Sequence, residues 1–237
     1  MVAEADIPIL VFDLAAIILD YTLGLVLLSK TMKLAPSPPR KYYLGVFVFF
    51  LVHSACRTVF FFRAYFVEKS DNVVRVPMFD IGTMLGVLSV ILLVYVIEST
   101  IVTRSKKVFT IFGCCALGIM VVDLFIRMTL ANRRLMVWVQ LITLPVLVAF
   151  IIAIYLRALL KSTGTVRKNA VVMLFAIVLL TLSEVANSEF ASMLLGSVTA
   201  RYLGPILMAA ALIVLYIAVV NLSIWKKIEP PAVAASS

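Results

Sequence analysis

Long apolar stretches, each ended by charged or turn-forming residues, dominate the pattern of this chain. A helix that crosses the hydrocarbon core of a membrane, roughly 30 Å thick, needs about 20 mainly apolar residues. Seven stretches meet this requirement, at residues 7–29, 42–66, 78–103, 108–130, 135–160, 170–195 and 202–225. The pattern predicts an all-α, polytopic membrane protein built as a bundle of seven transmembrane helices.

The connections between these stretches are short, at about 4 to 13 residues, so successive helices should be antiparallel neighbours. We therefore expect one transmembrane domain over residues 1–237. Composition agrees, because 64% of the residues are hydrophobic and 14% are charged, whereas a soluble domain holds about a quarter charged residues.

Lysines and arginines beside the predicted spans indicate the orientation, because such residues are retained on the cytoplasmic side. The larger set occupies alternate connections: Lys30, Lys33, Arg40, Lys41, Arg104, Lys106, Lys107, Arg157, Lys161, Arg167, Lys168, Lys226 and Lys227. The other side has only Lys69, Arg75, Arg133, Arg134 and Arg201. We expect a multi-pass protein of the cell membrane with its N-terminus outside and its C-terminus in the cytoplasm. The net charge is +9. We expect these cations to contact anionic lipid headgroups, and we expect no binding of nucleic acid.

Small residues inside the spans predict close packing. Gly82 and Gly86 form a GxxxG pattern that lets another helix backbone approach closely. We expect that helix to belong to the same bundle; dimerisation through this pattern is the alternative. Cys56, Cys114 and Cys115 also fall inside spans, so we expect them to be buried and without disulfides.

Ionisable and amide residues recur at one depth within the spans. Counted from the nearest cytoplasmic cation at about 1.5 Å per residue, this depth is about 24 to 26 Å. The residues there are Asp13, Arg57, Asp123, Gln140 and Glu184, and Asn187 shares the helix face of Glu184. A charge in hydrocarbon costs several kcal/mol unless it is paired or hydrated. We therefore expect these side chains to converge on one outward-facing polar pocket; a purely structural network of ion pairs is the alternative.

Asp20 and His53 lie deeper, near the membrane midplane, where water is hardest to reach. A carboxylate and an imidazole at similar depth on consecutive helices can form a hydrogen bond, and histidine titrates near neutral pH. The pair is either a satisfied core contact or a site for a proton or cation.

The residue inventory excludes several functions. A single histidine rules out bis-histidine haem ligation and the usual zinc sites. A histidine-assisted hydrolase would have to use His53, which lies deep in a span without a nucleophile elbow. We expect no enzyme activity, no metal and no cofactor.

The topology resembles that of microbial rhodopsins and, more distantly, of seven-helix receptors. The last span has no lysine before Lys226, so the resemblance does not extend to a retinal Schiff base. The segments 41–45 (KYYLG), 96–98 (VIE) and 106–111 (KKVFTI), together with Arg57 and Arg63, are similar to uncharacterised archaeal seven-helix membrane proteins over about the first half of the chain. That resemblance implies a receptor-like or opsin-like topology and no particular activity.

Our leading hypothesis is a receptor-like membrane sensor. It would bind a small or lipidic ligand in the outward-facing polar pocket and signal through a separate cytoplasmic partner. The cytoplasmic half is nearly all apolar, whereas a transporter would carry polar residues along its whole length. The alternative is a proton- or cation-coupled small-molecule transporter that uses Asp20 and His53. A third reading is a structural subunit of a larger assembly.

Overall fold

The computed structural model describes residues 7–68, 71–102, 106–127, 134–186 and 197–220. These residues form seven α-helices: α1 (Ile7–Met32), α2 (Pro38–Tyr65), α3 (Asn72–Thr100), α4 (Val108–Arg127), α5 (Arg134–Lys161), α6 (Gly164–Ala186) and α8 (Ser197–Val220). All seven are long and apolar enough to cross a membrane. The all-α, seven-helix class predicted from the sequence is confirmed over these residues, and the chain is a multi-pass membrane protein.

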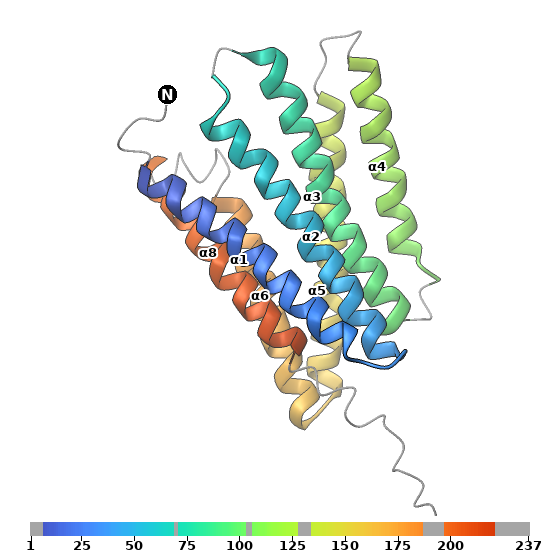
Figure 1. Ribbon diagram of the computed structural model, residues 1–237. Coiled ribbons are helices and arrows are strands. Elements are labelled where there is room, and N and C mark those ends of the chain that lie inside the picture. Colours follow the sequence, from blue (N-terminus) through green and yellow to red (C-terminus); the bar gives the residue numbers. More distant parts are fainter. Residues whose placement is uncertain (1–6, 69–70, 103–105, 128–133, 187–196, 221–237) are drawn as a thin grey trace, which may run out of the picture.

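Six of the helices form a closed ring. Going round it, α1 packs on α2, α2 on α3, α3 on α5, α5 on α6, α6 on α8 and α8 on α1. The seventh helix, α4, packs on α3 and α5 at one side of the ring, far from α1 and α8 (Figure 1). Many large apolar side chains point outward from the helices, such as Leu25, Phe125 and Leu160. That is the surface a helix presents to lipid.

The two ends of the bundle differ in charge. We call the end where α1 begins the N-terminal end and the end where α1 finishes the basic end (Figure 1). Lysines and arginines gather at the basic end, on the last turns of α1 and α5, the first turns of α2 and α6, and the segment before α4: Lys30, Lys33, Arg40, Lys41, Lys106, Lys107, Arg157, Lys161, Arg167 and Lys168.

Several helices begin earlier than the sequence pattern predicts. At the basic end, α2 begins at Pro38 and not at residue 42, and α6 begins at Gly164 and not at residue 170. Helix α3 begins at Asn72, ahead of the expected residue 78, because Asp71 caps it by accepting a hydrogen bond from the amide of Val74 at 3.2 Å. Helix α8 begins at Ser197, five residues before the expected start at 202. Parts of the expected spans, at residues 103, 128–130, 187–195 and 221–225, lie outside the described residues.

Glycines allow α2 and α3 to pack closely, as the GxxxG pattern predicts. A Cβ on Gly82 would lie 2.9 Å from the ring of Phe60, and one on Gly86 would lie 3.4 Å from Sγ of Cys56. The Cys56 thiol donates a hydrogen bond to the carbonyl of Gly82 at 3.1 Å. Cys56 is buried as expected, whereas the expectation for Cys114 and Cys115 is wrong, since both are exposed on α4. Because α4 lies outside the ring, more of its surface faces away from the protein.

Glu98, near the end of α3, caps the beginning of α4. Its Oε1 accepts a hydrogen bond from the Phe109 amide at 3.3 Å, and its Oε2 accepts from the amide and the hydroxyl of Thr110 at 2.8 and 2.5 Å. These amides belong to the first turn of α4. Backbone amides in the first turn of a helix have no hydrogen-bond acceptor within that helix. A carboxylate there also interacts favourably with the helix dipole. Glu98 is thus fully buried yet satisfied.

Candidate functional site

Arg57 on α2 lies between two carboxylates from different helices. Its Nη2 is 3.8 Å from Oδ1 of Asp13 on α1, and its Nη1 is 3.8 Å from Oε1 of Glu184 on α6. The Tyr65 hydroxyl donates a hydrogen bond to Oδ2 of Asp13 at 2.8 Å. We call Asp13, Arg57, Tyr65 and Glu184 the outer cluster; it lies towards the N-terminal end of the bundle.

The outer cluster is loosely paired and open. A direct hydrogen bond between a guanidinium and a carboxylate is about 2.7–2.9 Å long, so both ion pairs at 3.8 Å are too long for one. The side chains of Arg57, Asp13 and Glu184 are 14%, 22% and 56% exposed, respectively. Arg57 therefore retains donors for another group, and that group can reach the cluster.

Asp20 and His53 form a tight pair deeper in the bundle, between α1 and α2. Nδ1 of His53 lies 2.7 Å from Oδ2 of Asp20, and their side chains are 8% and 1% exposed. The spacing of the sequence explains why the pair and the cluster share one interface. Asp13 and Asp20 are two turns apart on α1, while His53 and Arg57 are one turn apart on α2.

Tightly packed apolar side chains close the interior on the basic side of this pair. The ring of Phe49 stacks on the His53 ring at 5.5 Å between centroids. Phe50 is next to Phe49 in the chain, and a Cβ placed on Gly24 of α1 would lie 3.1 Å from the Cβ of Phe50. Leu27, Tyr42 and Val46 continue this packing and are completely buried. Among the described residues of α1 and α2, the buried acidic and basic side chains thus extend no further towards the basic end than this pair.

Of the remaining residues of the predicted pocket, the structure describes Asp123 and Gln140. Asp123 is buried on α4, which packs on α3 and α5, so it lies away from the α1, α2 and α6 side chains that form the outer cluster. Gln140 is half-buried on α5. Asn187 falls outside the described residues. The structure therefore brings together Asp13, Arg57 and Glu184 of the predicted set and places Asp123 apart.

Tyr65 is a member of the outer cluster that the search for charged residues missed. It follows Arg57 by eight residues, about 2.2 helical turns, so the two side chains project within about 80° of each other around the axis of α2. The hydroxyl group of Tyr65 on this part of α2 is the sequence signal that identifies it.

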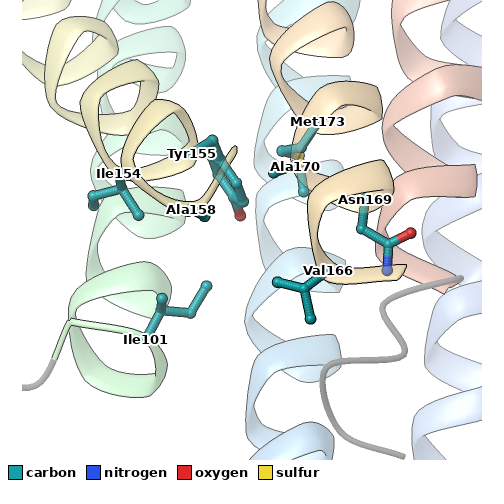
Figure 2. A pocket seen from close by; sticks show the side chains of 8 residues that line it. All are labelled: Ile101, Ile154, Tyr155, Ala158, Val166, Asn169, Ala170 and Met173. Carbon is teal, nitrogen blue, oxygen red and sulfur yellow. The ribbon is translucent and has the colours of Figure 1, made fainter. Parts of the chain in front are cut away.

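A separate cavity lies near the basic end, between α5 and α6 (Figure 2). Its volume is about 40 Å³, and its lining comprises Ile101, Ile154, Tyr155, Ala158, Val166, Asn169, Ala170 and Met173. The Tyr155 hydroxyl lies 3.4 Å from the Tyr42 hydroxyl of α2. Pockets that bind small molecules measure about 300–1,000 Å³, so this cavity does not suit a ligand.

Within the described ranges, no group of three or more histidine, cysteine, aspartate or glutamate side chains could hold a metal ion. No protein-family model matches the chain, and neither a curated protein nor a solved structure shows significant similarity to it. The outer cluster and the Asp20–His53 pair are the features of this structure that bear on function.

Proposed function

We propose that this protein is a receptor-like membrane sensor that binds a small ligand at the outer cluster and signals through a separate partner. In this proposal the N-terminal end faces the outside of the cell and the basic end faces the cytoplasm. The proposal rests on one observation above all: Arg57 stands 3.8 Å from both Asp13 and Glu184. A polar ligand could insert between these groups and replace two weak ion pairs with direct hydrogen bonds.

The arrangement of the helices explains how binding could become a signal. The three charged residues of the cluster come from α1, α2 and α6, and α2 and α6 are not consecutive in the ring. A ligand that tightens the contacts of Arg57 would pull α1 and α6 towards α2. Such a ligand shifts the equilibrium between two arrangements of the helices only if it binds one arrangement more tightly than the other. The basic end, where the same helices emerge, would present the change to a partner.

The closed interior on the basic side favours a sensor over a carrier. Among the described residues of α1 and α2, buried acidic and basic side chains reach only as far as Asp20 and His53, and the Phe49 ring and completely buried side chains fill the interface beyond them. The buried Glu98 carboxylate nearer the basic end is occupied as the cap of α4. A carrier must open a polar route on both sides of its binding site. A sensor needs access from one side only.

A thermal-shift screen of the purified protein tests the proposal. The probes are a set of small amines, carboxylates, phosphate esters and lysolipids, each added to protein in lipid nanodiscs. We expect at least one class to raise the melting temperature, and the rise to disappear in Arg57→Gln and in Glu184→Gln.

Arg63→Gln is the matched control for this screen. Arg63 is on the same helix, but its Nε donates to the carbonyl of Arg75 at 3.0 Å and its guanidinium lies over the ring of Phe79. It therefore takes part in the α2–α3 contact. The ligand response should persist in Arg63→Gln. A response that also persists in Arg57→Gln would refute the assignment of the site.

A proton- or cation-coupled carrier is the second candidate. One observation favours it: Asp20 is almost completely buried, and its Oδ1 has no hydrogen-bond partner among the described residues. An ionisable group held in this state within a membrane helix is typical of ion pathways. Vesicles containing the protein, loaded with a pH-sensitive dye, test this function. Proton flux that is present in the wild type and lost in Asp20→Asn would displace the sensor proposal.

A further inference from the structure

The charged groups of the outer cluster differ in their exposure. The Glu184 side chain is the most exposed, Asp13 is less exposed, and Arg57 is the least exposed of the three. A molecule that enters the cluster from its exposed side therefore meets hydrogen-bond acceptors first and hydrogen-bond donors behind them. The cluster offers a ligand two kinds of contact, and each kind limits the chemistry of its partner.

The carboxylates of the cluster select a positively charged nitrogen, because an ionised carboxylate only accepts hydrogen bonds. Oδ2 of Asp13 already accepts from the Tyr65 hydroxyl, and Oδ1 lies beside Arg57. Among the described residues, Glu184 has one long ion pair, through Oε1, and no hydrogen bond. An ammonium group has three donors and can form the short, charge-assisted hydrogen bonds that these oxygens lack.

The donors of Arg57 select a carboxylate. No hydrogen bond joins the guanidinium to another group in the described part of the chain, and the two carboxylates beside it are each 3.8 Å away. Its five N–H groups form a rigid fork, and a carboxylate matches this fork with two parallel hydrogen bonds. A phosphate monoester also matches the fork, but it would bring a second negative charge close to Asp13 and Glu184.

The two kinds of contact lie close together. Each carboxylate is 3.8 Å from the guanidinium, so the opposite charges of a ligand that contacts both must also be close. In an α-amino acid, the ammonium and the carboxylate are attached to the same carbon. Such a molecule adds no net charge to a site within the membrane, where net charge is costly.

We infer that the ligand of the outer cluster is a free α-amino acid. Its carboxylate binds Arg57, and its ammonium binds Glu184 and Asp13. This inference rests on the sensor function proposed above and names the class of ligand that the same site takes.

Thermal unfolding with the standard L-amino acids, each added alone to the protein in lipid nanodiscs, tests this class. We expect at least one of them to raise the melting temperature by about 5 °C or more at 100 times its Kd. If none of them raises the melting temperature, the inference is overturned.

Two derivatives of the responding amino acid test the two contacts on the wild-type protein, so this step does not depend on a variant that folds. Both derivatives keep the side chain. The methyl ester lacks the carboxylate charge, and the N-acetyl derivative lacks the ammonium. Each should bind more weakly by about 10-fold or more, because it loses charge-assisted hydrogen bonds. Undiminished affinity of either derivative would overturn the inference.

Variants of the protein assign each charge of the ligand to its partner. Arg57→Gln should weaken binding of the amino acid by about 10-fold or more. It should have little effect on binding of the methyl ester, which has already lost that contact. Glu184→Gln should show the same relation to the N-acetyl derivative, and Arg63→Gln should leave all affinities unchanged. Losses that multiply in full for both pairs would show that the assigned groups are not in contact, and would overturn the inference.

Failure of this inference can be told from failure of the proposed function. A response to simple amines or phosphate esters that requires Arg57 and Glu184, with no response to any amino acid, would keep the sensor site and overturn the ligand class. A response to an amino acid that is unchanged in Arg57→Gln would overturn the site as well.

Discussion

Arg57 and Glu184 approach each other across the ring of helices, with 3.8 Å between Nη1 and Oε1, although α2 and α6 are not consecutive in that ring. Asp13 approaches the same guanidinium from α1 at an equal distance. One side chain thus connects three helices at the N-terminal end through contacts that are open to another group.

These ion pairs should contribute little to stability. Exposed pairs are worth about 0–1 kcal/mol, and the Glu184 carboxylate is 56% exposed. A double-mutant cycle of Arg57→Gln and Glu184→Gln should give a coupling free energy below about 1 kcal/mol in unfolding measurements. A coupling of several kcal/mol would mean that the pair has a structural role, and it would weaken the case for a ligand site.

The Asp20–His53 pair should behave in the opposite way. Removal of one partner of a buried pair costs about 3–5 kcal/mol, because the other partner stays buried without compensation. Asp20→Leu alone should therefore lower the free energy of unfolding by about this amount, and Asp20→Leu with His53→Leu should recover most of it. Denaturant unfolding of the three proteins measures both effects. Additive losses would show that the two side chains are not coupled.

Gly45 should tolerate no side chain. A Cβ at this position of α2 would lie 2.0 Å from Cγ2 of Val96 on α3, and overpacking of this kind costs about 1–3 kcal/mol. Gly45→Ala should therefore lower the melting temperature. Gly118→Ala on α4 is the matched control, because nothing lies within 4 Å of its Cβ position. There the higher helix propensity of alanine should leave stability unchanged or raise it by up to about 1 kcal/mol.

Loss of the Glu98 carboxylate should destabilise the beginning of α4. Glu98→Ala removes the acceptor of two amides and one hydroxyl, and each unsatisfied buried group costs about 1–3 kcal/mol. Hydrogen exchange of the Phe109 and Thr110 amides should rise selectively, while α1 and α2 keep their protection. Glu98→Gln keeps one acceptor oxygen and should have a smaller effect. Uniform loss of protection along the chain would indicate a global effect instead of a cap.

Cysteine labelling checks the orientation. In a background without native cysteines, Glu68→Cys at the N-terminal end should react with an impermeant maleimide in intact cells. Lys33→Cys at the basic end should react only after the cells are permeabilised. Both positions are exposed in the described structure, so accessibility to the reagent is limited by the membrane alone. The reverse pattern would invert the topology inferred from the basic residues.

Counting residues along the chain gave the depth of each polar side chain but not its position around the bundle. Asp13, Arg57, Asp123 and Glu184 share a depth because the helical rise is constant. Their lateral positions depend on which helices pack together, and α4 packs outside the ring, which carries Asp123 away from the others. The role of Glu98 could not be predicted for the same reason. Its position along α3 does not reveal that it caps a neighbouring helix.

The sequence by itself determined the seven apolar helices, the asymmetry of basic residues between the two ends and the common depth of the Asp20 and His53 pair. These properties depend on local composition and on the fixed geometry of a helix in a bilayer. Only the tertiary structure decided that Arg57 lies between Asp13 and Glu184, that Tyr65 joins them and that Oδ1 of Asp20 has no partner in the described chain. Those relationships arise from side-chain packing between helices that are distant in sequence, which a one-dimensional pattern does not encode.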